Sequence, residues 1–250
     1  MILYFSATGN CKYVAERIAE RLGDRAVSIE KSDSRIVLED GETLGIVTPV
    51  TWWELPVIVR EYLEKVRIVC DYTPYSFIVT TYGTTPGCTY AEARKILAEK
   101  DFALFAGFSV KMPDNYTPIF DVSDTDKVKK QLAEAEVAIE GVILKIKNKF
   151  TGNHMKRKTP YCGRIITKPM LERARKTEKF YVENTCKGCG LCAKMCPAEA
   201  IEITDGHPVW AKDRCTLCLR CLHSCPRFAI QYGNGKTKLH GQYKNPNTNI

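Results

Sequence analysis

The first part of the chain alternates between short apolar runs and longer stretches in which apolar residues recur every three or four positions. The apolar runs, each long enough for one buried strand, cover residues 1–5, 25–29, 43–48, 76–81 and 103–110. Helical periodicity follows the first run, with Val14, Ala15 and Ile18 on one face, and returns at residues 56–67, 89–100 and 124–148. This alternation predicts an α/β domain over residues 1–148, with a doubly wound five-stranded parallel sheet.

Three of the predicted strands end in loops that suit ligand binding: Ser6–Cys11, Pro49–Trp53 and Thr81–Cys88. Ligands of doubly wound sheets bind outside the carboxyl ends of the strands, so we expect the three loops to lie together. The first loop joins a strand directly to a helix. Its backbone N–H groups therefore favour an anion such as a phosphate.

Two cysteine runs near the C-terminus have a different pattern, CKGCGLCAKMCP and CTLCLRCLHSCP, which both read C-x2-C-x2-C-x3-C-P. This is the spacing of cysteines that hold 4Fe-4S clusters. Zinc sites and disulfides are the alternatives. Zinc usually takes two separated cysteine pairs, and the N-terminus shows no export signal that would favour disulfides. The matching residues around the runs, such as Ala200-Ile201 and Ala229-Ile230, predict two copies of one small unit.

Composition and charge indicate the cellular compartment and the kind of partner. No apolar run is long enough to span a membrane, and the many thiols favour a reducing compartment, so we expect a cytoplasmic protein. The net charge is +8, and Lys145–Lys179 holds twelve Lys and Arg against two acids. No nucleic-acid recognition motif accompanies this segment, so we interpret residues 149–178 as a basic linker, with Lys156, Arg157 and Lys158 as a candidate docking site for an acidic redox partner. The oligomeric state is not indicated.

The cysteine region, about residues 179–232, closely resembles the bacterial two-cluster ferredoxins. The resemblance implies a small α+β ferredoxin-like domain with two 4Fe-4S clusters and crossed ligation. One cluster would be held by Cys186, Cys189, Cys192 and Cys225, and the other by Cys215, Cys218, Cys221 and Cys196. Residues 233–250 then form a polar C-terminal tail.

The first loop, within FSATGNCKYVAERIA, is similar to the phosphate loop of flavodoxins. The resemblance implies a flavodoxin-like fold that binds FMN, with the second and third loops on either side of the flavin ring. The implied phosphate contacts are Ser6, Thr8, Gly9, Asn10 and the backbone of Cys11, which replaces the family's threonine. The implied ring contacts are Pro49, Val50, Thr51, Trp52, Trp53, Thr81, Tyr82, Gly83, Gly87, Cys88, Asn115 and Tyr116. Of the two tryptophans, we expect one to stack on the ring and the other to pack inward.

The chain as a whole resembles the flavodoxin–ferredoxin fusions, to which PVTWWELP and VKMPDNY also correspond. That resemblance implies an electron-transfer protein with FMN, two 4Fe-4S clusters and redox partner proteins. An FMN-dependent reductase of a small substrate, with Tyr82 or Tyr116 as proton donor, is the alternative. A ferredoxin with an empty flavodoxin-like scaffold is a third. No acid–base constellation is visible, so no catalytic residue is assigned, and Cys11, Cys70, Cys88 and Cys162 are expected to be packing residues. No G-x-G-x-x-G follows a strand, so direct nicotinamide binding is not expected.

Overall fold

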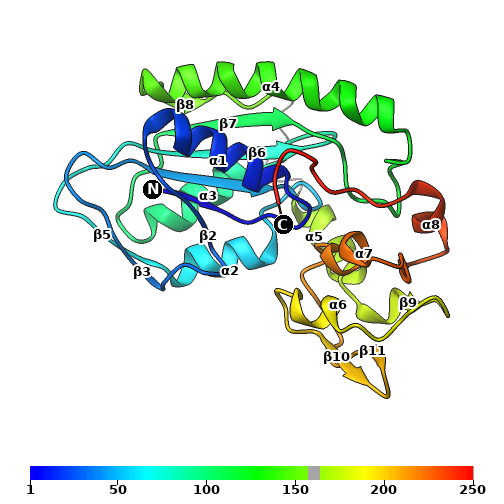
Figure 1. Ribbon diagram of the computed structural model, residues 1–250. Helices are drawn as coiled ribbons and strands as arrows, with labels where there is room; N and C mark the ends of the chain where they lie inside the picture. The colour runs from blue at the N-terminus through cyan, green and yellow to red at the C-terminus, as the bar shows by residue number, and fades with distance from the viewer. Residues whose placement is uncertain (157–163, 250) are drawn as a thin grey trace.

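The computed structural model describes residues 1–156 and 164–249 of the chain (Figure 1). Its largest element is a six-stranded parallel sheet. In spatial order the strands are β2 (Ala26–Ser28), β1 (Ile2–Tyr4), β4 (Leu44–Pro49), β6 (Ser76–Tyr82), β7 (Ala106–Lys111) and β8 (Gly152–Asn153). The five expected runs each form one strand, which confirms the doubly wound α/β fold. The sixth strand, β8, is a two-residue extension of the edge beside β7, too short to give a pattern in the sequence.

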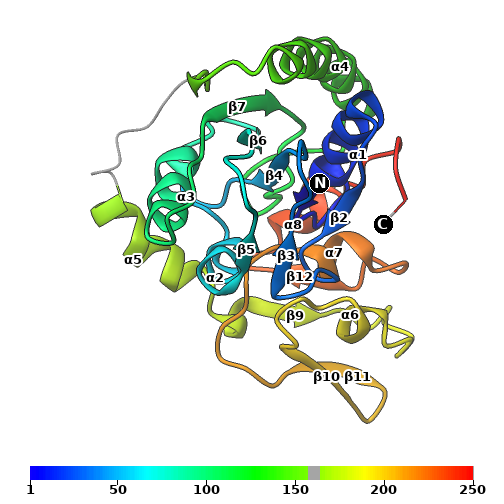
Figure 2. The same cartoon turned by 90° about the vertical axis from the view of Figure 1, so that its left-hand side faces the viewer.

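Helices cover both faces of this sheet (Figure 2). They are α1 (Asn10–Leu22) and α4 (Thr125–Lys147) on one face, and α2 (Val57–Lys65) and α3 (Thr89–Ala98) on the other. Each helix lies within a stretch that the apolar periodicity predicts. A separate pair of short parallel strands, β3 (Arg35–Val37) and β5 (Arg67–Val69), has no counterpart in that prediction.

The strand order reverses next to β1. This strand pairs with β2 on one side and with β4 on the other, so the chain leaves β1 in one direction along the sheet and later returns in the opposite one. Loops on the two sides of such a reversal diverge and leave a crevice at the carboxyl ends of the strands. The loop Ser6–Cys11 lies at this point.

The second domain lies beyond one end of the sheet (Figures 1 and 2). Its elements are α5 (Arg164–Ala174), a 3-10 turn (Thr177–Lys179), β9 (Phe180–Val182), α6 (Leu191–Lys194), β10 (Ile201–Thr204), β11 (His207–Trp210), α7 (Arg220–Ser224), β12 (Ile230–Tyr232) and α8 (Lys236–His240). β10 pairs with β11 and β9 pairs with β12, both antiparallel. In both pairs one strand comes from each cysteine repeat, so the two copies of the repeated unit interlock in one small α+β domain.

The segment expected to be a linker packs on both domains. Before the gap, β8 joins the sheet and Met155 is buried in the core between the sheet, α2 and α3. After the gap, Leu171 and Ala174 of α5 are buried in the core of the second domain. Arg157, Lys158 and Cys162 lie outside the described residues, so the proposed docking site there stays a prediction. Within the part of the chain that the structure describes, no helix is both long and apolar enough to cross a membrane.

Candidate functional site

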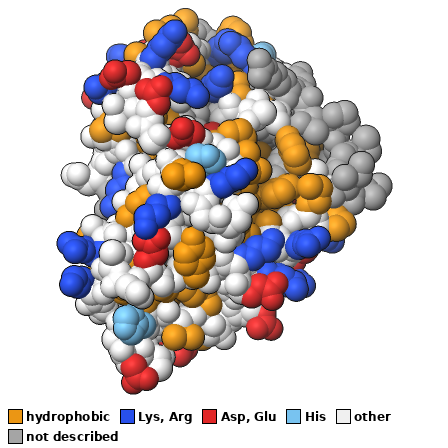
Figure 3. All heavy atoms as spheres, turned by 90° about the vertical axis from the view of Figure 1, so that its right-hand side faces the viewer, with side chains coloured by type: hydrophobic (Ala, Val, Ile, Leu, Met, Phe, Trp, Pro, Cys, Tyr) orange, Lys and Arg blue, Asp and Glu red, His pale blue; other side chains and the backbone are white. Residues whose placement is uncertain are grey.

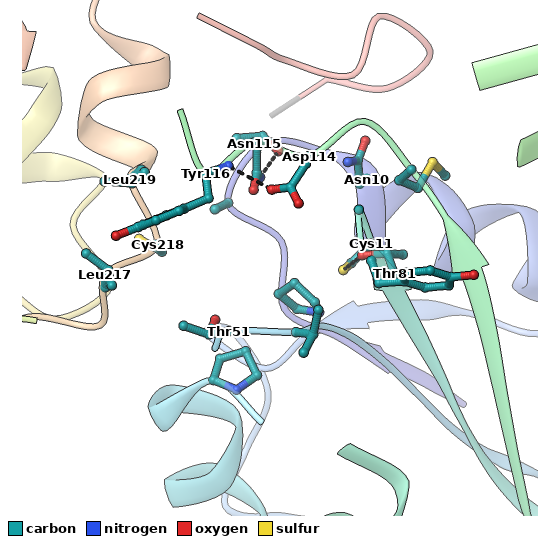
Figure 4. Close-up of a pocket in the computed structure, with 18 of the residues that line it drawn as sticks. Asn10, Cys11, Thr51, Thr81, Asp114, Asn115, Tyr116, Leu217, Cys218 and Leu219 are labelled. Carbon is teal, nitrogen blue, oxygen red and sulfur yellow. Dashed lines mark hydrogen bonds between the residues drawn. The ribbon is translucent and has the colours of Figure 1, made fainter. Parts of the chain in front are cut away.

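A cavity of about 250 Å³ lies where the three predicted loops meet, at the carboxyl ends of β1, β4 and β6 (Figure 4). Fourteen predicted contacts line it: Ser6, Thr8, Asn10, Cys11, Pro49, Val50, Thr51, Trp52, Trp53, Thr81, Tyr82, Gly83, Asn115 and Tyr116. Gly9, Gly87 and Cys88 do not line the cavity, although they shape the loops that do. The topology thus brings together residues that are far apart in sequence.

The first loop ends at an open helix N-terminus. Gly9 precedes α1 with φ of 101°, a left-handed conformation that suits glycine, and no side chain caps the helix there. The first N–H groups of a helix have no partner within it, so they are free to bind an anion. Ser6 accepts a bond from the Gly9 amide and Thr8 accepts one from Asn115, at 3.1 and 2.7 Å. Both hydroxyls keep their own protons for a phosphate.

Cys11 occupies the last position of this loop but faces a different partner. Its thiol lies 3.1 Å from the hydroxyl oxygen of Thr81. Burial raises the pKa of Cys11 to about 12. The side chain therefore stays a neutral thiol at neutral pH, as expected of a packing residue.

The two tryptophans occupy the tip of a tight turn. Thr51 and Glu54 exchange two backbone hydrogen bonds, and Trp52 and Trp53 between them have φ of 50° and 64°. Two positive φ values in a two-residue hairpin indicate a type I′ turn, which is strained for residues other than Gly, Asn or Asp. Both indoles line the cavity, and Trp53 is 37 % exposed. Trp52 also packs against the core of the second domain, and which of the two indoles stacks on a flavin ring stays a prediction.

The third loop contacts this turn through residues that do not line the cavity. The carbonyl of Trp53 accepts a 2.8 Å hydrogen bond from the Cys88 amide and a 3.2 Å contact from the Cys88 thiol. Gly87 lies so close that an added Cβ would be 2.0 Å from the same carbonyl oxygen. Gly87 and Cys88 therefore position Trp53 from outside the cavity.

Two ionisable residues on the loop after β7 also line the cavity. Burial raises the pKa of Asp114, although the Tyr116 amide donates to its carboxylate at 3.1 Å. Burial raises the pKa of Tyr116 as well. The cavity thus holds the carboxyl group of Asp114. Its position in the sequence, directly after Pro113, is typical of an ordinary turn residue and does not indicate this site.

The cavity wall also includes residues that no sequence signal placed at this site. Ile119 and Phe120 follow Tyr116 on the same loop. Thr216, Leu217, Cys218 and Leu219 come from the second domain (Figure 4). Trp52 and Tyr116 in turn pack against the core of that domain. Only the docking of the two domains creates this part of the site.

Within the second domain, the cysteines separate into the two expected groups. A small cavity of about 20 Å³ is lined by Cys186, Cys189, Cys192 and Cys225, with Pro226 beside them. The sulfurs surround a space rather than one point: in residues 1–156 and 164–249, no three Cys, His, Asp or Glu side chains lie close enough to hold a single metal ion. We call this group the outer set, because its Cys189 is exposed.

The inner set is Cys215, Cys218, Cys221 and Cys196. Burial raises the pKa of Cys215 to about 12. Burial also raises the pKa of Cys221 well above its ordinary value, and the other three thiols of the set add to that shift. Four thiolates at these positions therefore need a cationic group among them, which the irons of a cluster would supply.

Backbone amides point at the sulfurs in a repeated pattern. Cys186 accepts from the amide two residues later and so does Cys215, at 3.5 and 3.3 Å. Cys196 and Cys225 each accept from the amide four residues later, both at 3.3 Å. Such N–H···S bonds stabilise the charge of cluster ligands. The donor set of both groups fits iron–sulfur clusters.

Comparison with known proteins agrees with this geometry. Residues 1–113 match the family model of the flavodoxin domain, and residues 185–238 match that of the 4Fe-4S dicluster domain. A ferredoxin of Methanothermococcus thermolithotrophicus is 46 % identical over 48 residues, which cover 18 % of this chain and 80 % of the ferredoxin. The chain is a flavodoxin–ferredoxin fusion. The fusion thus joins a flavodoxin domain to a 4Fe-4S dicluster domain in one chain.

Other relatives match the fusion only in part. One component of an ion-translocating oxidoreductase complex from Methanosarcina acetivorans is 39 % identical over 56 residues, 22 % of the fusion and 21 % of that component. The fusion thus spans about a fifth of that relative. A solved archaeal flavodoxin superposes with a TM-score of 0.37 at 15 % identity, over 58 % of the fusion and 96 % of the flavodoxin.

Proposed function

We propose that the fusion relays electrons between a redox partner protein and FMN through two 4Fe-4S clusters in series. The outer set, Cys186, Cys189, Cys192 and Cys225, would hold the cluster that exchanges electrons with the partner. The inner set, Cys215, Cys218, Cys221 and Cys196, would hold the cluster next to the flavin. The observation that carries the proposal is Cys218, which belongs to the inner set and also lines the cavity of the phosphate loop.

The exposure of the cysteines supports this order. Cys189 of the outer set is exposed, whereas Cys215 of the inner set is buried. A cluster exchanges electrons with a partner most readily where its ligands reach the surface, and with the flavin most readily where they reach the cavity. On the face drawn in Figure 3, apolar side chains gather near the centre with Lys and Arg among them, a mixture that suits a short-lived protein contact.

The residues of the cavity fit FMN in two respects, and the redox chemistry of FMN fits the relay. The open N-terminus of α1 suits the phosphate. The apolar and aromatic wall, which includes Trp52 and Tyr116, suits a flat ring. FMN exchanges two electrons and each cluster exchanges one, so a flavin beside a cluster lets the protein join one-electron and two-electron reactions.

The test uses anaerobically purified protein and two matched cysteine variants. The parent should contain about eight irons and about eight sulfides per chain, with one FMN. Cys189→Ser should lose the outer cluster and most reduction by protein donors, yet keep FMN. Cys218→Ser should lose the inner cluster and stop electron exchange between the remaining cluster and FMN. Cys70→Ser, which changes a thiol outside both sets, is the control. Exchange that survives in Cys218→Ser would contradict the serial order.

The reductase of a small substrate is a second candidate, favoured by one observation. Asp114 places a carboxyl of raised pKa in the flavin cavity, and such a group can donate a proton to a bound substrate. A reductase would consume a small oxidant stoichiometrically when only the clusters are fed electrons, and Asp114→Asn would slow this turnover. A carrier would show neither effect.

A further inference from the structure

Arg220 lies between two cysteines of the inner set and reaches out of its own domain. It is the first residue of α7, between Cys218 and Cys221, and only 7 % of it is exposed. Its guanidinium forms a double hydrogen bond with Glu30, in the loop after β2 of the flavodoxin domain, at 2.7 and 2.6 Å. A buried cation in a cysteine run thus pairs with a carboxylate of the other domain.

The same guanidinium reaches both cofactor sites. It donates to the carbonyl of Ser6, the first residue of the phosphate loop, at 2.9 Å. It also donates to the carbonyl of Met195, next to Cys196 of the inner set, at 3.0 Å, and it lies 5.5 Å from the ring centre of Phe5. One side chain therefore connects the two cysteine runs with the phosphate loop.

The charge of Arg220 is met first by its double hydrogen bond with Glu30, and Cys218 and Cys196 of the inner set also lie near enough to act on it. Its Nε lies buried and finds no hydrogen-bond partner among the described residues. A buried N–H without a partner is unfavourable, so this donor fits a site where sulfur of a cluster would be the acceptor.

The internal repeat shows that this arginine is special to the inner run. The two runs are 29 residues apart from Cys186 to Cys215, so the counterpart of Arg220 is Leu191. Leu191 lines the small cavity of the outer set and makes no such bridge. A cation at this position, directly before the third cysteine, is present only in the run that faces the flavodoxin domain.

We propose that Arg220 is a positioning residue that fixes the inner cluster against the phosphate loop and raises the reduction potential of that cluster relative to the outer one. This inference rests on the proposed electron relay for its purpose, although the potential can be measured without it. A positive charge beside a cluster favours the reduced form, as do hydrogen bonds to its sulfurs. Arginine suits the role because its planar fork binds Glu30 with two bonds and still has donors for two carbonyls.

The experiment compares the potentials of the two clusters by redox titration with EPR detection, in protein loaded with iron and sulfide. Arg220→Gln should shift the potential of the inner cluster to more negative values and leave the outer one in place. Glu30→Gln should shift the inner potential the opposite way, because it removes a negative charge and leaves the arginine. Arg227→Gln is the control for the inner potential, which it should leave unchanged, since Arg227 is exposed beside the outer set. An unchanged inner potential in both Arg220→Gln and Glu30→Gln would overturn the proposal.

The positioning role has its own measurement. Arg220→Lys keeps the charge but cannot form the fork, so it should retain more of the inner potential than Arg220→Gln and still slow electron exchange between cluster and FMN. Full exchange rates in Arg220→Lys would refute the positioning role. Should Arg220→Gln fail to fold, Glu30→Gln and Arg220→Lys still decide the question. If the parent protein shows no exchange between cluster and FMN, the relay fails, whereas the shifts in potential still test Arg220.

Discussion

The hydroxyl of Tyr243 donates a 2.6 Å hydrogen bond to the side-chain oxygen of Asn10, 233 residues earlier in the chain. Both residues are buried. The side chain of Asn245 donates to the same oxygen at 3.1 Å. The backbone N–H of Asn245 donates to the carbonyl of Thr8 at 2.7 Å. The C-terminal tail thus covers the phosphate loop and fixes the amide of Asn10.

This contact predicts that the tail strengthens FMN binding. Tyr243→Phe removes one hydrogen bond to Asn10 and should raise the dissociation constant of FMN about fivefold, since such a bond contributes about 1 kcal/mol. Fluorescence titration of flavin-free protein measures the constant. Tyr181→Phe, on a tyrosine that is 39 % exposed in the second domain, is the control. Equal affinity of Tyr243→Phe and the parent would contradict the prediction.

Gly87 gives a second prediction, because its left-handed φ and the nearby carbonyl of Trp53 both disfavour a side chain at this position. Gly87→Ala should lower the free energy of unfolding by more than Gly23→Ala does. Both glycines have left-handed φ, of 64° and 66°, which costs an alanine about 1 kcal/mol. Only at Gly87 does the new Cβ also meet the Trp53 carbonyl, at 2.0 Å. Thermal unfolding and FMN retention test this, and equal losses in the two variants would show that the loop moves freely.

Asp114 predicts a dependence of stability on pH. Its pKa is raised in the folded protein, so the folded state holds the proton over a window above the ordinary carboxyl pKa of 3.8. The contribution of Asp114 to stability therefore falls as the pH rises through that window. Asp114→Asn should be more stable than the parent at pH 7, and the difference should shrink toward pH 4. Melting temperatures at the two pH values measure this; a difference that grows as the pH falls would contradict it.

Cys11 predicts a pattern of chemical labelling. The thiolate is the reactive form, and burial raises the pKa of Cys11 to about 12. Iodoacetamide at pH 8 should therefore label the half-buried Cys70 in the native holoprotein and leave Cys11 unmodified, as mass spectrometry of the digest would show. After unfolding, both should react. Labelling of Cys11 at the rate of Cys70 in the native protein would mean that the loop opens.

Local patterns made much of the site predictable. The apolar run before Ser6 and the helix after it depend on near neighbours, so the phosphate loop could be placed without coordinates. The loops at Pro49 and Thr81 followed from the rule that parallel strands end on one edge. Their meeting in one cavity agrees with that rule. The strands β3, β5 and β8 were missed because they lie outside the apolar runs that mark β1 and β2, strands that are equally short or only one residue longer.

The conformation of single residues was less accessible. Adjacent side chains on an extended strand point to opposite faces, and this alternation is the reason to expect one of the two tryptophans to pack inward. Trp52 and Trp53 instead lie in a turn with positive φ. Trp rarely adopts this conformation unless surrounding contacts stabilise it. Packing of Trp52 on Tyr116 and on the second domain, together with the Cys88 bond to Trp53, holds the turn.

The sequence by itself determined the two cysteine runs, the alternation of strands and helices, and the phosphate loop, because each depends on spacing along the chain. Only the tertiary structure decided which run faces the flavin cavity, that Arg220 joins it to Glu30 and Ser6, and that the polar tail closes over Asn10. These contacts join residues about 190 or more positions apart. Their partners are set by how two separately patterned domains dock, and docking leaves no periodicity in either domain.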